Sequence, residues 1–256
     1  MWTAGENVGI LANGLEDRSR EIKISRILAS VAGGYLLLSF IAPLAMPEGT
    51  VPELSGRANA FDYATESGWG NQNHGEGATV GHDQSAHGGT FAWAELNPLW
   101  AFVYSFGDLN CHQKHERSWE INGNQMPMCT RDVGIFFGFV VGAALFGRRG
   151  LNRWTVRDTF LSIIPDQRLE PIYLTDKRML AMLAIIGLGL IPIAVDGFTQ
   201  HLTNYESTNP VRVVTGLLCG LVLGWLIAAS ASARTKYFED DPELVVLPAN
   251  ARLMTK

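Results

Sequence analysis

Four long apolar segments separated by polar stretches dominate the hydrophobic pattern of the chain. They cover residues 27–46, 133–147, 179–195 and 211–233. A helix needs roughly 20 apolar residues to cross about 30 Å of hydrocarbon. The pattern therefore predicts an all-α integral membrane protein with four transmembrane helices, which together form a membrane domain over 27–233.

A fifth segment, 91–109, is apolar and aromatic but shorter. Glu95, Asn97 and Pro98 interrupt it, so only 99–107 is continuously apolar, and that part is too short to span. Trp and Tyr favour the membrane–water boundary. We expect an interfacial or re-entrant helix here.

Basic residues mark one side of the predicted spans. Lys and Arg are dense in the N-terminal segment 1–26, in 148–178 and in the tail 234–256. The segment 47–93 carries a single one, Arg57. Cytoplasmic loops of membrane proteins carry the excess of Lys and Arg. We therefore predict a multi-pass protein of the cell (plasma) membrane with both termini cytoplasmic and the polar segment 110–132 extracytoplasmic.

The segment 47–90 is predicted to be a mobile outer loop, because its second half is rich in Gly and Asn. Its histidines and nearby acids are His74, His82, His87, Glu76 and Asp83. Loose spacing in a flexible segment makes chelation entropically costly. A solvated loop is therefore favoured over a metal site in this stretch.

The polar segment 110–132 concentrates the reactive side chains. Its candidate metal ligands are Cys111, His112, Cys129 and Asp132. Zinc, or another divalent metal, accepts such mixed sulfur, nitrogen and oxygen donors. A Cys111–Cys129 disulfide is an open alternative, because extracytoplasmic cysteines commonly pair. A cysteine nucleophile activated by His112 or His115 is a third possibility.

The predicted topology brings further polar residues to the same membrane face. Asp196 and Gln200 end the third span, and Arg212 begins the fourth. Arginine suits the geometry of phosphate groups. The candidate catalytic residues, with no role assigned, are His112, His115, Glu116 and Asp196. The candidate substrate-binding residues are Gln113, Arg117, Gln125, Arg131, Gln200 and Arg212.

Two rows of glycines repeat every four residues. They are Gly134, Gly138 and Gly142, and Gly216, Gly220 and Gly224. Small residues at this spacing let helix backbones approach closely. We therefore predict that the spans 133–147 and 211–233 pack as a parallel pair through these faces.

Composition excludes some classes of protein. The 256-residue chain has a net charge of −5 and only three cysteines. It lacks a basic patch interleaved with aromatic residues, so no nucleic-acid partner is expected. Three cysteines also exclude a disulfide-rich scaffold.

Three motifs follow one another along the chain. The first motif has three parts: Cys-His-Gln at 111–113, Glu-Arg-Ser at 116–118 and Gln-x-Pro-x-Cys-x-Arg at 125–131. The second is Asp-Gly-x-x-Gln at 196–200, and the third is Arg-x-x-Thr-Gly at 212–216. Their order resembles that of an uncharacterised family of prokaryotic integral membrane proteins, a domain of unknown function. Where many members have Cys-x-Arg-Cys, this chain has Asp132. The resemblance implies the membrane fold and the motif set, but no activity.

These observations predict a polytopic membrane protein with an outward-facing polar site that binds a metal and acts on a lipid or small substrate at the membrane surface. The alternative is a non-enzymatic transporter, or an assembly or scaffold protein with a structural Cys111–Cys129 disulfide. Transporters normally carry midplane polar groups and internal repeats, and neither is evident here. The expected partners are the lipid bilayer and a homo-oligomer or larger membrane complex.

Overall fold

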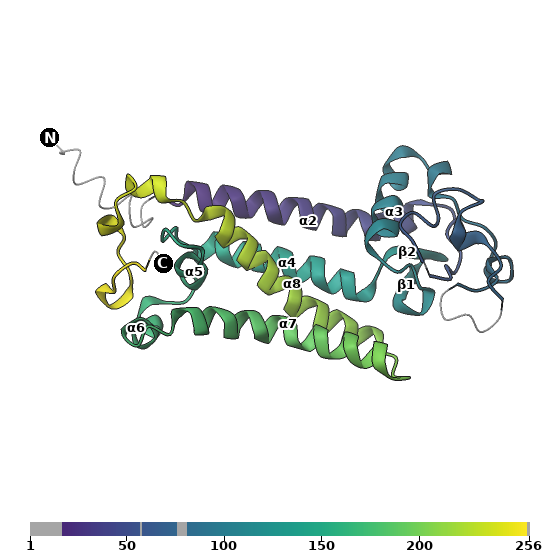
Figure 1. Ribbon diagram of the computed structural model, residues 1–256. Coiled ribbons are helices and arrows are strands. Elements are labelled where there is room, and N and C mark those ends of the chain that lie inside the picture. The colour runs from purple at the N-terminus through teal and green to yellow at the C-terminus, as the bar shows by residue number, and fades with distance from the viewer. Residues whose placement is uncertain (1–16, 57, 76–80, 255–256) are drawn as a thin grey trace. The chain divides into compact units, whose positions relative to one another are not determined.

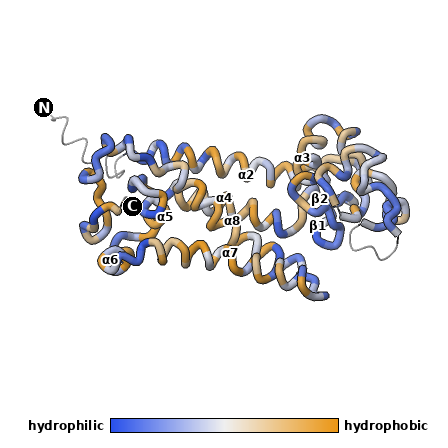
Figure 2. Tube along the Cα trace, viewed as in Figure 1, coloured by the Kyte–Doolittle hydropathy of each residue, from blue (hydrophilic) through white to orange (hydrophobic). Residues whose placement is uncertain are grey.

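The computed structural model describes residues 17–56, 58–75 and 81–254. Within them, four helices are long and apolar enough to cross a membrane (Figure 1). They are α2 (Ser19–Ala45), α4 (Thr130–Arg149), α7 (Arg178–Leu202) and α8 (Asn209–Ser232). Figure 2 shows these helices as mainly hydrophobic. The four predicted spans are confirmed as helices, and α2 and α7 extend several residues beyond the predicted ranges.

Three shorter helices connect the long ones. They are α3 (Pro98–Asn110), α5 (Val156–Leu161) and α6 (Asp166–Leu174). α3 has 13 residues, too few to cross a bilayer. Its start is fixed by the Asn97 side chain, which accepts the N–H groups of Leu99 and Trp100. Short 3₁₀ turns lie at 69–71, 84–87, 93–95, 115–117, 235–238, 242–244 and 248–250.

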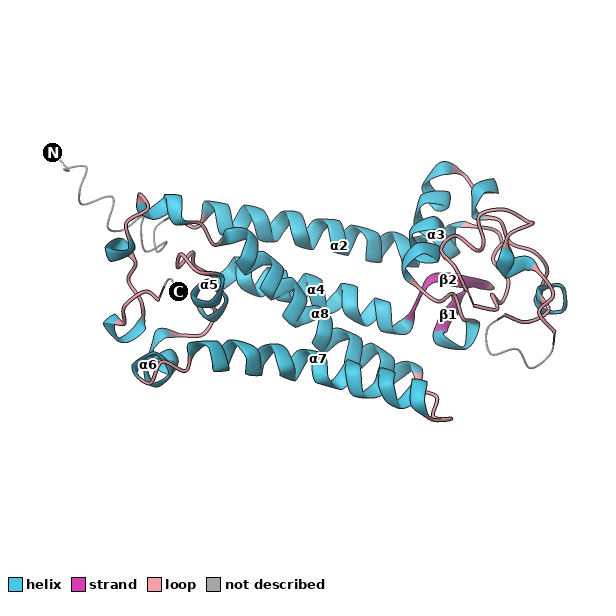
Figure 3. Cartoon of the chain, in the orientation of Figure 1, coloured by secondary structure: helices cyan, strands magenta, loops and turns pink. Residues whose placement is uncertain are grey.

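The all-α prediction is wrong in one place, where the polar segment forms a small sheet (Figure 3). Strands β1 (Ser118–Ile121) and β2 (Asn124–Cys129) pair antiparallel. Asn122 and Gly123 connect them with φ angles of 52° and 65°. Two consecutive positive φ angles are typical of a tight hairpin turn, and Asn-Gly is the dipeptide that adopts them most readily.

The chain divides into two compact units. Unit 1 comprises the described residues of Met1–Ala32, Phe137–Phe198 and Leu218–Lys256, and unit 2 comprises those of Gly33–Phe136 and Thr199–Leu217. In unit 1, the rings of Phe160 and Trp225 stack with centroids 4.2 Å apart, and the Trp225 indole N–H donates to the Phe160 carbonyl at 2.8 Å. Phe146, Leu169 and Phe238 are buried around this pair.

The segment 47–90, predicted to be a mobile loop, contributes to the core of unit 2. Val51, Leu54 and Tyr63 are each at most 1% exposed. Asp108 of α3 anchors the segment, because its Oδ2 accepts the Tyr63 N–H at 3.0 Å. Residues 57 and 76–80 of this segment, with the predicted acid Glu76, and residues 1–16 of the N-terminal segment lie outside the described residues.

The predicted glycine contact between α4 and α8 is confirmed in both units. In unit 2, a Cβ added to Gly134 would collide with the Val213 carbonyl oxygen. In unit 1, a Cβ added to Gly142 would collide with the Leu221 carbonyl oxygen. Gly216 and Gly224 of α8 meet α4 carbonyls in the same way, those of Arg131 and Phe139. The contacts advance along both helices together, as in a parallel pair.

Candidate functional site

The C-terminal end of α3 packs directly on β2. Cys111 follows α3, and its N–H donates to the Gly107 carbonyl at 2.8 Å. Gly107 lies so close to the Pro127 carbonyl that any Cβ at residue 107 would collide with it. The Gln113 side chain donates to the same carbonyl at 3.0 Å. This close approach brings Cys111 beside Cys129, the last residue of β2.

Cys111, Cys129 and Asp132 form a compact group of possible metal ligands. One ligand atom from each lies within 4.8 Å of the others. The Cys129 N–H donates to the Cys111 sulfur at 3.1 Å, and the Cys129 thiol donates to Asp132 Oδ2 at 3.3 Å. Both cysteines are free thiols, so the predicted disulfide is not formed in this structure. His112 is exposed and stands outside the group, which therefore contains three of the four predicted ligands.

The surroundings of Cys111 disfavour its thiolate. The pKa of its thiol lies well above the usual 9.0, first because of its hydrogen bond with Cys129 and second because of burial. Electrostatic interactions with Cys129 and Asp132 raise this pKa further. A divalent cation placed among these atoms would oppose all of these effects, since it stabilises thiolates directly.

A small cavity of about 190 Å³ adjoins the sulfur group. Cys111 and Asp132 line it together with the rings of Tyr35, Phe106 and Phe136. Tyr35 and Phe106 meet edge to face with centroids 4.6 Å apart. An ion held by the three ligands would therefore face a largely aromatic space that admits a small molecule.

Unit 2 also gathers the three predicted arginines. Arg117 pairs with both oxygens of the Glu206 carboxylate, at 2.9 and 3.2 Å. Arg212 pairs with the same carboxylate and donates to the Ser207 carbonyl at 2.9 Å. Arg212 is only 2% exposed, and the charges of Arg117 and Arg131 both act on it. Arg117 and Arg212 thus share one carboxylate, and we call these two residues together with Arg131 the arginine cluster.

The arginine cluster changes the pKa of the Glu206 carboxyl. Partial burial acts to raise its pKa, but the hydrogen bonds and charges of Arg117 and Arg212 outweigh burial. The pKa of Glu206 therefore lies below its usual 4.5. At neutral pH the carboxylate is ionised and serves as the counter-charge of the buried Arg212.

Two predicted substrate-binding glutamines, Gln113 and Gln125, hydrogen-bond to the backbone. Gln113 and Gln125 are each 1% exposed. Gln113 donates to Pro127, and Gln125 Oε1 accepts the Leu54 N–H at 2.8 Å. These contacts join the segment after α2 to the hairpin and thereby position the sulfur group.

Asn124 was not predicted from the sequence to have a structural role, although it joins several segments of unit 2. It is fully buried, and its Oδ1 accepts the Val51 N–H at 2.8 Å. Its Nδ2 donates to the carbonyls of Pro43 and Pro47, each at 3.0 Å. Its position directly after the Asn-Gly turn was the available signal.

The remaining predicted residues are not members of the sulfur group. His115 Nε2 stands 3.6 Å from a Glu53 oxygen, and Glu116 is exposed. Asp196 is buried in unit 1, whereas the cysteines belong to unit 2. Gln200 belongs to unit 2, and its Nε2 has no hydrogen-bond partner among the described residues. Roles for these four residues stay predictions.

The chain is similar in sequence to a family of membrane proteins and to two archaeal proteins. Residues 111–226 match a family described as "Predicted membrane protein (DUF2085)". The chain is 30% identical over 137 residues to the uncharacterised protein MJ1492 of Methanocaldococcus jannaschii, an alignment that covers 52% of this chain and 73% of that relative. It is 31% identical over 116 residues to an uncharacterised protein of Methanothermobacter thermautotrophicus, covering 45% and 82%. No solved structure matches the chain.

Proposed function

Since the chain belongs to the DUF2085 family of predicted membrane proteins, we propose its function from the side chains gathered in unit 2. The protein binds a thiophilic divalent metal ion, with zinc as the first choice, through Cys111, Cys129 and Asp132. The ion and the arginine cluster then serve a small anionic substrate or lipid head group at the membrane surface.

One observation carries the metal proposal: the three ligand atoms lie within 4.8 Å of one another. Zinc bonds of about 2.0–2.3 Å require neighbouring ligand atoms to stand roughly 3.3–3.8 Å apart. Side-chain shifts of about 1 Å therefore suffice to close the site around an ion. Zinc sites with three protein ligands leave a fourth position open for chemistry, whereas structural sites are normally closed by four. The cavity beside Cys111 and Asp132 supplies space for that fourth ligand.

The arginine cluster supports an anionic partner. Arg117 and Arg212 already hold a carboxylate, that of Glu206. Guanidinium groups bind carboxylates and phosphates through the same paired N–H groups. An incoming anion would compete with Glu206 for these donors.

The proposed setting is the plasma membrane, with both termini in the cytoplasm and the sulfur group on the extracytoplasmic side. The density of Lys and Arg in the N-terminal, 148–178 and C-terminal segments supports this orientation. Assembly into a homo-oligomer or a larger membrane complex is compatible with this setting and stays a prediction.

Cobalt substitution tests the metal proposal. Co²⁺ bound by thiolates gives an intense sulfur-to-cobalt charge-transfer absorption, so the detergent-purified, reduced protein is expected to show this band on Co²⁺ addition. Cys111→Ser and Cys129→Ser should each remove or strongly weaken the band. Cys219→Ser is the matched control, because Cys219 lies in α8 outside the group, and it should leave the band unchanged. Absence of the band in the reduced wild-type protein would refute the proposal.

The close approach of the two cysteines also favours a second candidate, a scaffold stabilised by a Cys111–Cys129 disulfide. Mass spectrometry of protein alkylated directly in isolated membranes distinguishes the two. Alkylated thiols at both positions favour the metal site, whereas a disulfide-linked peptide pair favours the scaffold.

A further inference from the structure

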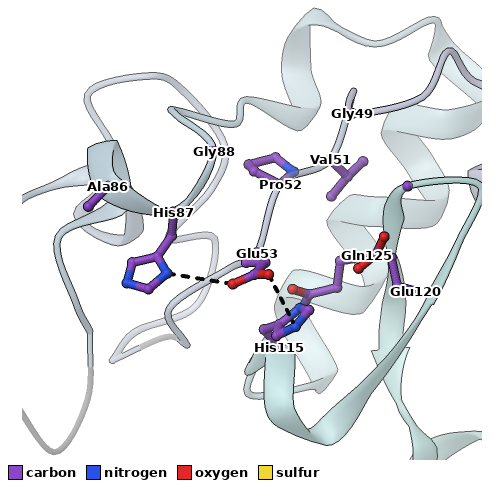
Figure 4. Close-up of a pocket in the computed structure, with 11 residues that line it drawn as sticks. Gly49, Val51, Pro52, Glu53, Ala86, His87, Gly88, His115, Glu120 and Gln125 are labelled. Atoms are coloured by element: carbon purple, nitrogen blue, oxygen red, sulfur yellow. Dashed lines mark ion pairs between the residues drawn. The ribbon is translucent and has the colours of Figure 1, made fainter.

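A second cavity of unit 2, about 410 Å³ in volume, lies between the segment that follows α2 and the hairpin (Figure 4). Its polar lining consists of Glu53, His87, His115, Glu120 and Gln125. None of these side chains belongs to the sulfur group. Glu53 and His87 also lie outside the stretch that matches the family.

Glu53 lies between two imidazole rings (Figure 4). Its Oε2 is 3.5 Å from His87 Nδ1, and its Oε1 is 3.6 Å from His115 Nε2. Good N–H···O hydrogen bonds measure about 2.7–3.2 Å, so both separations are long for hydrogen bonds. Metal bonds of about 2.0–2.2 Å at tetrahedral angles place adjacent nitrogen and oxygen ligands about 3.4 Å apart. Each histidine–Glu53 separation is close to that of two ligands of one ion. The ligand atoms of the three side chains do not all lie within 4.8 Å of one another, so one ion reaches all three only after side chains rotate.

Gln125 supplies an independent sign of a ligand. It is 1% exposed, and the Leu54 N–H fixes the orientation of its amide by donating to Oε1 at 2.8 Å. Its Nε2 finds no hydrogen-bond partner in the part of the chain that the structure describes. Buried donors are normally paired. This donor belongs to a residue that lines the cavity, where a ligand oxygen would satisfy it.

Backbone contacts hold the three possible ligands in place. Gln84 is the first residue of the short turn that ends at His87. Its buried side chain donates to the Glu53 carbonyl at 2.8 Å. The His115 N–H donates to the Leu54 carbonyl at 3.0 Å. The Glu53, His87 and His115 side chains are 49%, 44% and 31% exposed, so an ion has access from solvent. The backbone at these positions is thereby held, and the three side chains reorient to bind an ion.

We propose that Glu53, His87 and His115 bind a second divalent transition-metal ion, and that Gln125 donates to an exchangeable oxygen ligand on that ion. Two imidazoles and one carboxylate suit zinc, cobalt and nickel, and the absence of sulfur separates this set from the thiophilic one. Glu120, which lines the same cavity, adds negative charge that favours a cation. The inference is independent of the proposed function.

The test uses the full chain carrying both Cys111→Ser and Cys129→Ser, so that thiolate binding is removed. Titration with Co²⁺ is expected to give visible ligand-field bands without sulfur charge transfer, and one bound ion per chain. Glu53→Gln, His87→Ala and His115→Ala should each raise the Kd about tenfold or more, since losing even an outer-shell partner costs 10–100-fold. His201→Ala is the matched control, because His201 is exposed at the end of α7 and should leave the Kd unchanged.

Binding that is absent, or equally tight in the His87→Ala and His115→Ala variants, overturns the proposal. If the double cysteine variant fails to fold, elemental analysis of Co²⁺-loaded protein with all cysteines present replaces the titration. His87→Ala must then lose one ion per chain relative to His201→Ala while it keeps any sulfur band. Loss of the sulfur band alone concerns the other site, so the two proposals fail separately.

Discussion

Among single residues, Glu206 supplies the counter-charge of a buried arginine. Arg212 is 2% exposed, and a buried guanidinium without a counter-charge is strongly destabilising. Glu206 supplies that charge while its own side chain remains 56% exposed. Because Arg117 shares the carboxylate, an anion that displaces Glu206 meets two arginines already in position.

The lowered pKa of Glu206 predicts a pH dependence of stability. A carboxyl whose folded pKa lies below its unfolded value stabilises the fold above the unfolded value, near 4.5, and this contribution is lost as the pH falls through the folded pKa. Glu206→Gln should therefore lower the Tm at pH 7, and the difference from wild type should shrink below about pH 4.5. Thermal unfolding in detergent, repeated from pH 7 to below about pH 4.5, measures this difference in Tm. Glu243→Gln, at an exposed position, is the control, and a pH-independent difference for Glu206→Gln would contradict the prediction.

At the scale of elements, the hairpin was the least predictable part of the site. Residues 124–128 of β2 are all buried, so the strand lacks the alternation of apolar and polar positions that marks a half-exposed strand. The Asn-Gly dipeptide at 122–123 was a usable signal, but the reactive side chains on either side of it favoured the interpretation of an irregular metal-binding loop. The contact between α3 and β2 depends on Gly107, whose role appears only in three dimensions.

The glycine rows, in contrast, predicted the packing of α4 on α8 correctly. A spacing of four residues places small side chains on one helix face, and in a membrane this pattern marks a contact between backbones. Gly134, Gly142, Gly216 and Gly224 all meet carbonyls of the other helix.

Gly142→Leu and Gly216→Leu are expected to disrupt this contact. In each case the new side chain would collide with backbone, which cannot move aside as a flexible side chain does. We expect a loss of roughly 3 kcal/mol or more, at or above the upper end of the usual cost of overpacking. Thermal aggregation in detergent measures the effect. Gly197→Leu in α7, where a Cβ meets nothing within 4 Å, is the matched control and should melt like wild type.

At the scale of the whole molecule, the four spans followed from hydropathy because each is determined within its own segment. The division into two units did not, since it depends on contacts between distant segments. The N–H of Tyr63 reaches Asp108, 45 residues along the chain. Composition alone gave no indication that the glycine-rich segment before α3 would help to form a core.

Membrane orientation is the whole-molecule prediction. In cells that carry Glu66→Cys, a membrane-impermeant maleimide should label the protein directly, because position 66 is exposed in unit 2 and predicted to be extracytoplasmic. Glu243→Cys should be labelled only after permeabilisation. The parent chain, with its native cysteines, gives the background. Labelling of position 243 in intact cells, with position 66 protected, would reverse the proposed orientation.

The sequence positions of the two thiols have a mechanical consequence. Cys111 directly follows α3, and Cys129 directly precedes α4. Any bridge between the sulfurs, whether an ion or a covalent bond, would therefore cross-link the end of α3 to the start of α4 and fix the angle between α3 and the first turn of α4. A chelator or a reductant would remove that bridge, while the contacts of α3 with β2 and with the core of unit 2 would remain.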